Sequence, residues 1–349
     1  MIEIDGSLGE GGGQVLRTCL SLSVLTGQPF HLSKIRAGRE KPGLKPQHLK
    51  SIDAVAAISR AAVIGNDINS KEITFTPGTI RSGRYRFDIG TAGSSELVLQ
   101  TIYLPLCKAD SASSVIITGG THVPWSPCYH YLEYQWMQFL QRLGIEFVIS
   151  LEQSGFYPQG GGRIDAIIRP VEFIQALSMV ERGKLLKISG ISAVANLDSS
   201  IAERQKRQAI QRMQSFLKEY GNPEIRIKIF DLPSKFKGTV ILLKAEYENG
   251  SGCYYSLGEL GKPAERVADE AIESLMEYLI SGSAVDQYLA DQLLVPLSFA
   301  VQKSEFSTSK ITSHLMTNAE IIRKFLDISI DIEGELGKPG KVTLEPFGS

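Results

Sequence analysis

The chain repeats one order of predicted elements three times, and this recurrence constrains the fold more than any single motif. Each copy runs strand, helix, strand, loop, helix and two strands over about 80 residues, with apolar spacing that separates helices from strands. The third copy is split between its first strand and its first helix. We therefore expect an α/β protein of three βαβαββ-type units packed around a pseudo-threefold axis.

The boundaries between the copies are predicted from glycine-rich turns that interrupt the apolar runs. The first copy is expected to end with strands at 72–76 and 85–89, and the second to open a helix after 89–95. The third begins near 171–173, but its first helix is delayed until 284–299. A long insert therefore separates the two parts of the third copy.

The insert has strands and helices of its own, so we expect it to form a small α/β domain at 183–281. Residues 1–182 and 282–349 would then make up a catalytic domain of three units. The insert's predicted helix at 201–220 is basic. Two interpretations of this helix stay open, a solvated face and a contact with nucleic acid. The basic side chains are Arg204, Lys206, Arg207 and Arg212.

A glycine-rich loop, Gly-Glu-Gly-Gly-Gly-Gln at 9–14, precedes a predicted helix that ends near Gly27. Glycines let a ligand approach the backbone, and unpaired N–H groups at a helix start favour phosphate. Glu10 repels phosphate unless a cation lies between them, which indicates a metal–phosphate site. The loop lacks the P-loop Lys, and Gln14 replaces the third glycine of the dinucleotide fingerprint. A simple tight turn is the alternative interpretation.

The segment at 34–47 is a second candidate for phosphate binding. It carries several cations against the single acid Glu40, and Arg36 and Arg39 flank a flexible Ala-Gly pair. Two guanidinium groups in this arrangement suit bidentate contacts with phosphate. A solvated basic loop is the alternative.

Composition restricts the class of protein. The chain is 43% hydrophobic and 21% charged, with a net charge of −1, so no global positive field attracts nucleic acid. The four cysteines show no zinc or disulfide spacing, and there is no signal peptide and no apolar run long enough to span a membrane. We expect a soluble intracellular protein without membrane contact. It would be cytoplasmic, or nuclear if the source is eukaryotic.

Three histidines, His48, His130 and His314, fall near the starts of the second helices of the three copies. No H-x-x-x-H or H-E-x-x-H spacing supports a shared metal site. For His314, the open alternatives are a packed residue at a helix start and a nucleophile or acid–base group. Small polar neighbours that would orient its ring are Thr312, Ser313, Thr317 and Asn318. We expect His31, on a strand, to be structural.

Taken together, these motifs resemble the RNA 3′-terminal phosphate cyclase family, in order and over nearly the whole chain. The resemblance rests on a combination of segments rather than on one. They are Asp5-Gly6 with the glycine loop, Ile35–Arg39, Lys41–Leu44, Gln47–Leu49, Ile89–Ser94, Gly155–Pro158, Tyr288–Gln292 and Ser313–Asn318. The family's fold, as the resemblance implies, has three α/β repeats with a smaller α/β insert in the third.

The resemblance implies an ATP-dependent conversion of an RNA 3′-phosphate to a 2′,3′-cyclic phosphate, with AMP and pyrophosphate released. His314 matches the family's nucleophile, which forms a covalent histidine–AMP. AMP then passes to the RNA 3′-phosphate, and the neighbouring 2′-OH displaces it. A neutral imidazole is nucleophilic at cellular pH, since its reference pKa is about 6.5.

The resemblance also implies roles for individual residues. Glu10 matches the ligand of a divalent metal, Mg or Mn, on the triphosphate. Residues that match phosphate contacts of ATP or the RNA end are Arg17, Arg36, Arg39 and Gln47. Residues that match the nucleotide pocket are Gln100, Pro127, Tyr288, Asp291 and Gln292.

Two other functions are alternatives to this one. A cyclase-like branch of the family acts in ribosome assembly without catalysis, but it lacks the histidine, so His314 argues against it, as do Arg36 and Arg39. Three-repeat enolpyruvyl transferases share related α/β units and need no histidine–AMP. The sequence leaves open whether the protein is a monomer or a homodimer, which RNA it acts on, and what the insert does.

Overall fold

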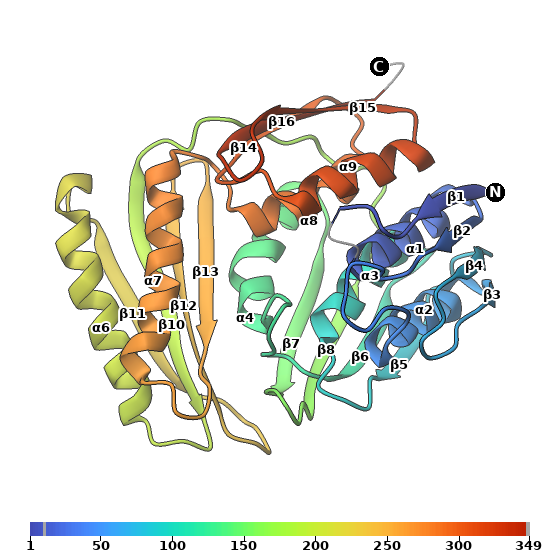
Figure 1. The fold of residues 1–349 in the computed structure, drawn as a ribbon. Coiled ribbons are helices and arrows are strands. Elements are labelled where there is room, and N and C mark those ends of the chain that lie inside the picture. The colour runs from blue at the N-terminus through green and yellow to red at the C-terminus, as the bar shows by residue number, and fades with distance from the viewer. Residues whose placement is uncertain (10–11, 347–349) are drawn as a thin grey trace.

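The first of four sheets shows how each unit is built. The computed structural model describes residues 1–9 and 12–346, and Figure 1 shows its ribbon. Strands β1 and β2 are parallel, while β4 pairs antiparallel with both β2 and β3, which gives the order β1-β2-β4-β3. The elements are β1 (Ile2–Asp5), α1 (Gln14–Thr26), β2 (Phe30–Ser33), α2 (Pro46–Ser59), β3 (Ala62–Ile64) and β4 (Ile73–Thr76).

Two more sheets follow the same connectivity, with the orders β5-β6-β8-β7 and β9-β14-β16-β15. The second unit contains β5 (Arg84–Asp88), α3 (Ser95–Cys107), β6 (Ser113–Gly119), α4 (Tyr129–Tyr131), the π-helical segment η1 (Leu132–Trp136), α5 (Met137–Arg142), β7 (Phe147–Gln153) and β8 (Gly162–Ile168). The third contains β9 (Ser178–Met179), α8 (Gln287–Leu297), β14 (Ser304–Thr308), α9 (Ser313–Phe325), β15 (Ile328–Gly334) and β16 (Gly340–Pro346). The α/β fold class is confirmed. The pseudo-threefold axis stays a prediction.

Two predicted strands were assigned wrongly. The strand at 85–89 does not close the first unit, because β5 pairs in parallel with β6 and so opens the second sheet. The first unit is instead completed by β3, which has only three residues. The segment at 171–173 is not a strand; the third unit begins with the two-residue β9.

The fourth sheet lies in the chain between β9 and α8 and has the order β11-β10-β12-β13. Helices α6 and α7 cover one of its faces, on the left of Figure 1. Its elements are β10 (Leu185–Ala195), α6 (Ser200–Phe216), the 3-10 turn η2 (Leu217–Tyr220), β11 (Glu224–Asp231), β12 (Gly238–Tyr247), β13 (Ser251–Leu257) and α7 (Ala264–Ser281). All fall within the predicted insert at 183–281, whose independence as a domain stays a prediction.

The two faces of the fourth sheet serve different cores. Along β12, Ile241 and Leu243 pack in the cluster under α6 and α7, whereas Leu242 belongs to the large core shared by the other three units. This alternation follows from the period of two in a strand. The fourth sheet is therefore packed against the rest of the molecule through its second face.

The helices of the three units pack against one another: α1 contacts α9 and α3, α2 contacts α3, and α8 contacts α9. The third sheet lies outside α8 and α9 at the top of Figure 1. This arrangement brings the starts of α1 and α9, far apart in sequence, to one place. None of the helices within 1–9 and 12–346 combines the length and apolar character that crossing a bilayer requires.

Candidate active site

The described part of the glycine loop lies against the first turn of α9. A Cβ built on Gly9 would fall 2.0 Å from Oγ1 of Thr317 and 3.6 Å from the Ser313 carbonyl oxygen, and Gly9 has a φ of +58°. Only glycine suits such an approach. The loop is thus packed beside His314, the second residue of α9.

The following glycines face cationic side chains. A Cβ on Gly12 would lie 3.3 Å from a guanidinium nitrogen of Arg39. One on Gly13 would lie 2.4 Å from Nε2 of His48 and 3.0 Å from Nη1 of Arg17. The small residues let these side chains reach the start of α1, whose cap residue, Gly13, has no side chain to pair with the first N–H groups.

The pKa of His48 reflects the positive charge of this region. The pKa of His48 is lowered to about 3, first by burial and then by the positive charges of Arg17, Arg36 and Lys45. The imidazole is therefore neutral, and its Nδ1 accepts a hydrogen bond from the Lys45 backbone N–H at 3.1 Å. Three cations around one neutral ring form a positive site suited to phosphate. We did not predict His48 as part of this site; its place beside Gln47 was the available signal.

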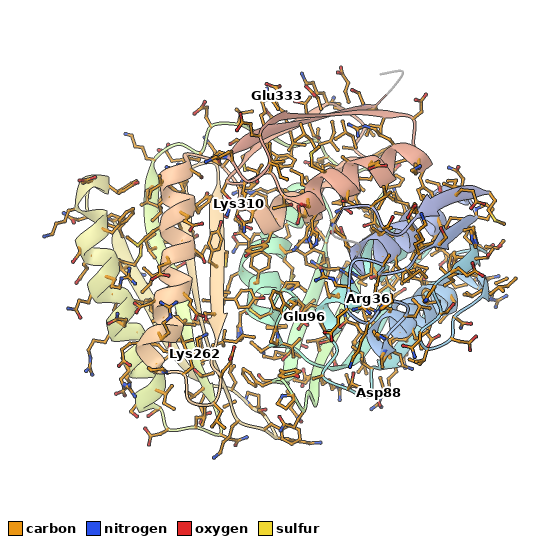
Figure 2. All side chains as sticks on the ribbon, viewed as in Figure 1. Arg36, Asp88, Glu96, Lys262, Lys310 and Glu333 are labelled. Atoms are coloured by element: carbon orange, nitrogen blue, oxygen red, sulfur yellow. The ribbon has the colours of Figure 1, made fainter. Side chains whose placement is uncertain are left out.

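Arg36 shapes the basic loop as well as adding charge. Its Nη1 donates to the carbonyl oxygens of Lys41 at 2.8 Å and Gly43 at 3.1 Å. Partial burial and the nearby charge of Arg39 lower the pKa of Arg36, and burial lowers the pKa of Arg17 to about 10. Both remain protonated at neutral pH. Figure 2 labels Arg36 on this loop.

Gln47 links the basic loop to the second unit. Its Oε1 accepts a hydrogen bond from the Ser94 backbone N–H at 3.1 Å, just before α3. Of the four predicted phosphate residues, Arg17 and Arg36 both lie close enough to His48 to lower its pKa. Arg39 lies beside Gly12. Gln47 contacts the segment 90–94 through Ser94.

His314 lies beside a carboxylate. Its Nδ1 is 3.7 Å from Oδ2 of Asp291, a residue of α8, and about two fifths of the His314 side chain is exposed. Asp291 is held from the other side by Thr312, whose Oγ1 donates to Oδ1 at 2.7 Å. We predicted Asp291 for the nucleotide pocket and Thr312 as a partner of the imidazole. In the structure Thr312 orients Asp291, and Asp291 lies next to the ring.

Two side chains of α1, Gln14 and Thr18, connect this helix to the first turns of α9. Nε2 of Gln14 donates to the carbonyl oxygen of His314 at 3.4 Å. Thr18 donates to Oδ1 of Asn318 at 2.8 Å, and Asn318 donates to the Asp291 carbonyl oxygen at 3.1 Å. Arg17 on α1, with the cations of the basic loop beside it, and the histidine on α9 therefore belong to one site.

The predicted nucleotide-pocket residues are partly brought together. Nε2 of Gln100 on α3 donates to Oε1 of Gln292 on α8 at 2.9 Å. The half-exposed ring of Tyr288 packs edge-on against Tyr254 of β13, with ring centroids 5.9 Å apart. Within residues 1–9 and 12–346, no hydrogen bond or ring contact joins Pro127 to Gln100, Tyr288 or Gln292.

Strand β13 contacts this part of the site through residues on both of its faces. Tyr254 contacts Tyr288, while the next residue, Tyr255, donates from its hydroxyl to the carbonyl oxygen of Ser126, beside Pro127. Neighbouring residues of a strand point to opposite faces. The predicted insert thus contributes to the border of the site, a role that its sequence did not indicate.

The predicted metal ligand, Glu10, lies outside the described residues. Across 1–9 and 12–346, no group of three or more His, Cys, Asp or Glu side chains is arranged to hold a metal ion. The divalent metal stays a prediction.

The fold and the site define an α/β protein in which a helix-start histidine, beside a carboxylate, lies near a cluster of cations at a glycine loop. The sequence model of a family described as RNA 3′-terminal phosphate cyclase matches residues 8–332. The chain therefore belongs to the RNA 3′-terminal phosphate cyclase family.

Curated relatives named RNA 3′-terminal phosphate cyclase match over nearly full length. The protein of Nostoc punctiforme is 41% identical over 332 residues, 93% of this chain and 94% of its own length. That of Methanopyrus kandleri is 41% identical over 353 residues, covering 100% and 99%. That of Archaeoglobus fulgidus is 43% identical over 335 residues, covering 96% and 98%.

Proposed function

We propose that this protein uses ATP to convert RNA 3′-phosphate ends to 2′,3′-cyclic phosphates. The observation that carries the proposal is the position of His314, beside Asp291 and joined through α1 to a cluster of arginines. A nucleophile next to a phosphate-binding region is what nucleotidyl transfer needs. Membership of the family supports the same activity.

In the first step, His314 attacks the α-phosphorus of ATP through Nε2. An N–P bond forms while the bond from that phosphorus to the pyrophosphate oxygen breaks, giving histidine–AMP and pyrophosphate. A proton on Nδ1, facing Asp291, would place the unshared electron pair on Nε2, and the Asp291 carboxylate would stabilise the positive charge that develops on the ring. Arg17 would take part of the triphosphate charge.

In the second step, an oxygen of the RNA 3′-phosphate attacks the phosphorus held by His314. The N–P bond breaks, the imidazole is restored, and the RNA carries AMP through a diphosphate link. The neighbouring 2′-OH then attacks the RNA phosphorus, loses its proton to solvent and displaces AMP. Arg36, Arg39 and Gln47 would position the RNA phosphate, because guanidinium groups bind such oxygens in pairs.

The nucleotide would lie against α3, α8 and β13. Gln100 and Gln292 offer amide groups for hydrogen bonds, and Tyr288 offers an aromatic face for adenine, with Pro127 as its proposed counterpart. Asp291 would contribute here as well as to His314. We also keep Glu10 as the proposed ligand of a divalent metal, Mg or Mn, which would neutralise phosphate charge when bound.

The test uses ATP labelled at the α-phosphate and a divalent metal, without RNA. We expect label that survives denaturation, is acid-labile and is absent from His314→Ala. His31→Ala is the matched control, since His31 lies on β2 and pairs with Thr74 through its ring. No label in the unchanged protein, with ATP binding shown separately, would refute the nucleophile and favour the non-catalytic RNA-binding branch of the family.

A further inference from the structure

Two loops of the second unit meet around a buried aromatic ring. Phe156, in the loop at 154–161, stacks on the ring of His122, with centroids 4.9 Å apart. The His122 backbone N–H donates to the Gly155 carbonyl oxygen at 2.9 Å. The loop at 121–126 is therefore fixed against the loop at 154–161.

A third loop, at 232–237 between β11 and β12, joins them. The Ser154 backbone N–H donates to the Pro233 carbonyl oxygen at 2.7 Å. A Cβ on Gly238 would fall 2.1 Å from the ring of Phe156, so the fourth sheet also packs on this ring. We call the outer side of the loops 121–126, 154–161 and 232–237 the three-loop surface; they meet near the lower ends of the strands in Figure 1.

Each of the three loops carries one exposed aromatic side chain. Trp125 is fully exposed at 100%, Tyr157 is 67% exposed and Phe236 is 37% exposed. Trp125 also has a φ of +65°, a left-handed conformation that is strained for a bulky residue. Exposing three aromatic rings to water is unfavourable in free energy, and a ligand that covers them would remove this cost. Planar bases stack on such rings.

A cavity of about 360 Å³, lined largely by polar residues and glycines, lies beside Phe236, whose ring is 3.0 Å from a Cβ built on the lining residue Gly161. Asp88, labelled in Figure 2, accepts from Thr118 at 2.8 Å, which helps keep its pKa below the ordinary value, so it is ionised. Arg163 is paired with Asp165 at 2.6 Å. The ionised Asp88 and the pairing of Arg163 with Asp165 disfavour a phosphate here, whereas this mixture of donors and acceptors suits a base and its ribose hydroxyls. The lining includes Asp88, Thr91, Gln153, Gln159, Arg163 and Lys235.

Phosphates of a strand crossing this surface would meet cations at its edge. Lys235 lines the cavity, and both Lys235 and Lys237 are exposed on the same loop as Phe236. Alternating aromatic and cationic side chains are typical of surfaces that bind single-stranded nucleic acid.

The surface continues from the cationic cluster. Gly93 packs on Gln47, with its Cβ position 3.1 Å from the Cβ of Gln47. On the far side of that segment, a Cβ on Gly160 would fall 2.8 Å from the Cα of Ala92. Residues 90–94 therefore connect the proposed site of the RNA phosphate to the loop that carries Tyr157.

We propose that the three-loop surface binds the single-stranded RNA that leads to the 3′-phosphate, with bases stacked on Trp125, Tyr157 and Phe236. This inference rests on the proposed function. It predicts that substrates are single-stranded ends several nucleotides long, because paired bases cannot stack on protein side chains.

The experiment measures binding of 3′-phosphorylated RNA by fluorescence anisotropy without ATP. We expect Trp125→Ala and Phe236→Ala each to weaken an octanucleotide about tenfold, with a smaller effect on a dinucleotide. Ile64→Ala is the matched control, since Ile64 is 73% exposed on β3, away from these loops. A duplex with a paired 3′-phosphate end should bind more weakly than the octanucleotide.

Equal octanucleotide binding by the variants and the unchanged protein would overturn the proposal, as would equal binding of the duplex. Failure of the proposed function is distinguished by the ATP-labelling test, in which the unchanged protein would then take no label. Circular dichroism of each variant verifies folding. A second variant replaces the exposed Lys235 and Lys237 with Ala, and its RNA binding should depend less on salt concentration.

Discussion

The hydroxyl of Thr312 joins the start of helix α9 to the carboxylate of Asp291. Its Oγ1 accepts a hydrogen bond from the Leu315 backbone N–H at 3.0 Å and donates to Oδ1 of Asp291 at 2.7 Å. The other carboxylate oxygen lies 3.7 Å from Nδ1 of His314. One side chain therefore caps the helix that carries the proposed nucleophile and fixes the group that orients it.

Replacing Asp291 with Asn tests whether the carboxylate orients His314. The amide keeps the shape but removes the negative charge that favours a proton on Nδ1 and stabilises the charged ring. We expect Asp291→Asn to slow label transfer from ATP to protein by about 100-fold. Single-turnover labelling at saturating ATP measures this rate.

A separate ATP-binding measurement distinguishes the two roles considered for Asp291. If the variant binds ATP as tightly as the unchanged protein but is labelled slowly, the carboxylate acts on the imidazole. A labelling rate that recovers fully at high ATP would contradict this role and leave Asp291 as a nucleotide contact.

The cap itself should be measurable as stability. Thr312→Ala removes the acceptor for the Leu315 N–H, and such losses cost about 1 kcal/mol. Thr312→Ser keeps the hydroxyl and should restore both stability and labelling rate. Urea unfolding measures the first and ATP labelling the second; equal stability of the Ala and Ser variants would exclude the cap.

Much of the fold was predictable because its strands and helices have strong periods. The elements of the fourth sheet and the helix at His314 lie where the apolar spacing placed them. Strand β3 was missed because it has three residues and begins two positions after Arg60, the left-handed end of α2. Without it, β5 was taken as the end of the first unit, since only pairing with β6 shows its true place.

The site was predictable only in part. Motifs marked the glycine loop and His314, but not that Gly9 packs on Thr317 or that Gln14 reaches the His314 carbonyl oxygen. These contacts join residues about 300 positions apart, which local spacing cannot reveal. The place of Tyr254 beside Tyr288 likewise depends on how the fourth sheet packs.

Lys244 is expected to hold the fourth sheet to the second unit. Its buried Nζ donates to the Tyr134 carbonyl oxygen at 2.7 Å and to Oε1 of Gln138 at 2.5 Å. Lys244→Met keeps the apolar stem and leaves both acceptors unpaired, so we expect a loss of about 1–3 kcal/mol in unfolding free energy.

The control for Lys244 is Lys187→Met on the adjacent strand. Lys187 is nearly half exposed and its ion pair with Glu246 spans 3.4 Å, so its loss should cost about 0–1 kcal/mol. Equal effects of the two substitutions in urea unfolding would contradict the anchoring role of Lys244.

Glu96 should make the protein less stable as pH rises. The side chain is fully buried at the start of α3; Oε2 accepts from Ser94 at 2.9 Å, and Oε1 has no hydrogen-bond partner within the described residues. Burial raises the pKa of Glu96 to about 8, against 4.5 for an ordinary glutamate. Between these values the folded state holds a proton that the unfolded state has lost.

The sign follows from this difference in bound protons. From pH 4.5 to 8 the unfolded state binds fewer protons, so Glu96 lowers the unfolding free energy by about 1.4 kcal/mol per pH unit. Glu96→Gln does not titrate, so its stability relative to the unchanged protein should rise steadily from pH 5 to 8 and level off outside the window.

Glu265→Gln is the control. Pairing with Arg204 lowers the pKa of Glu265, so the difference in unfolding free energy between this variant and the unchanged protein should stay constant above pH 6. Parallel urea-unfolding curves for Glu96→Gln and the unchanged protein across this range would show that Glu96 is ionised in the folded state.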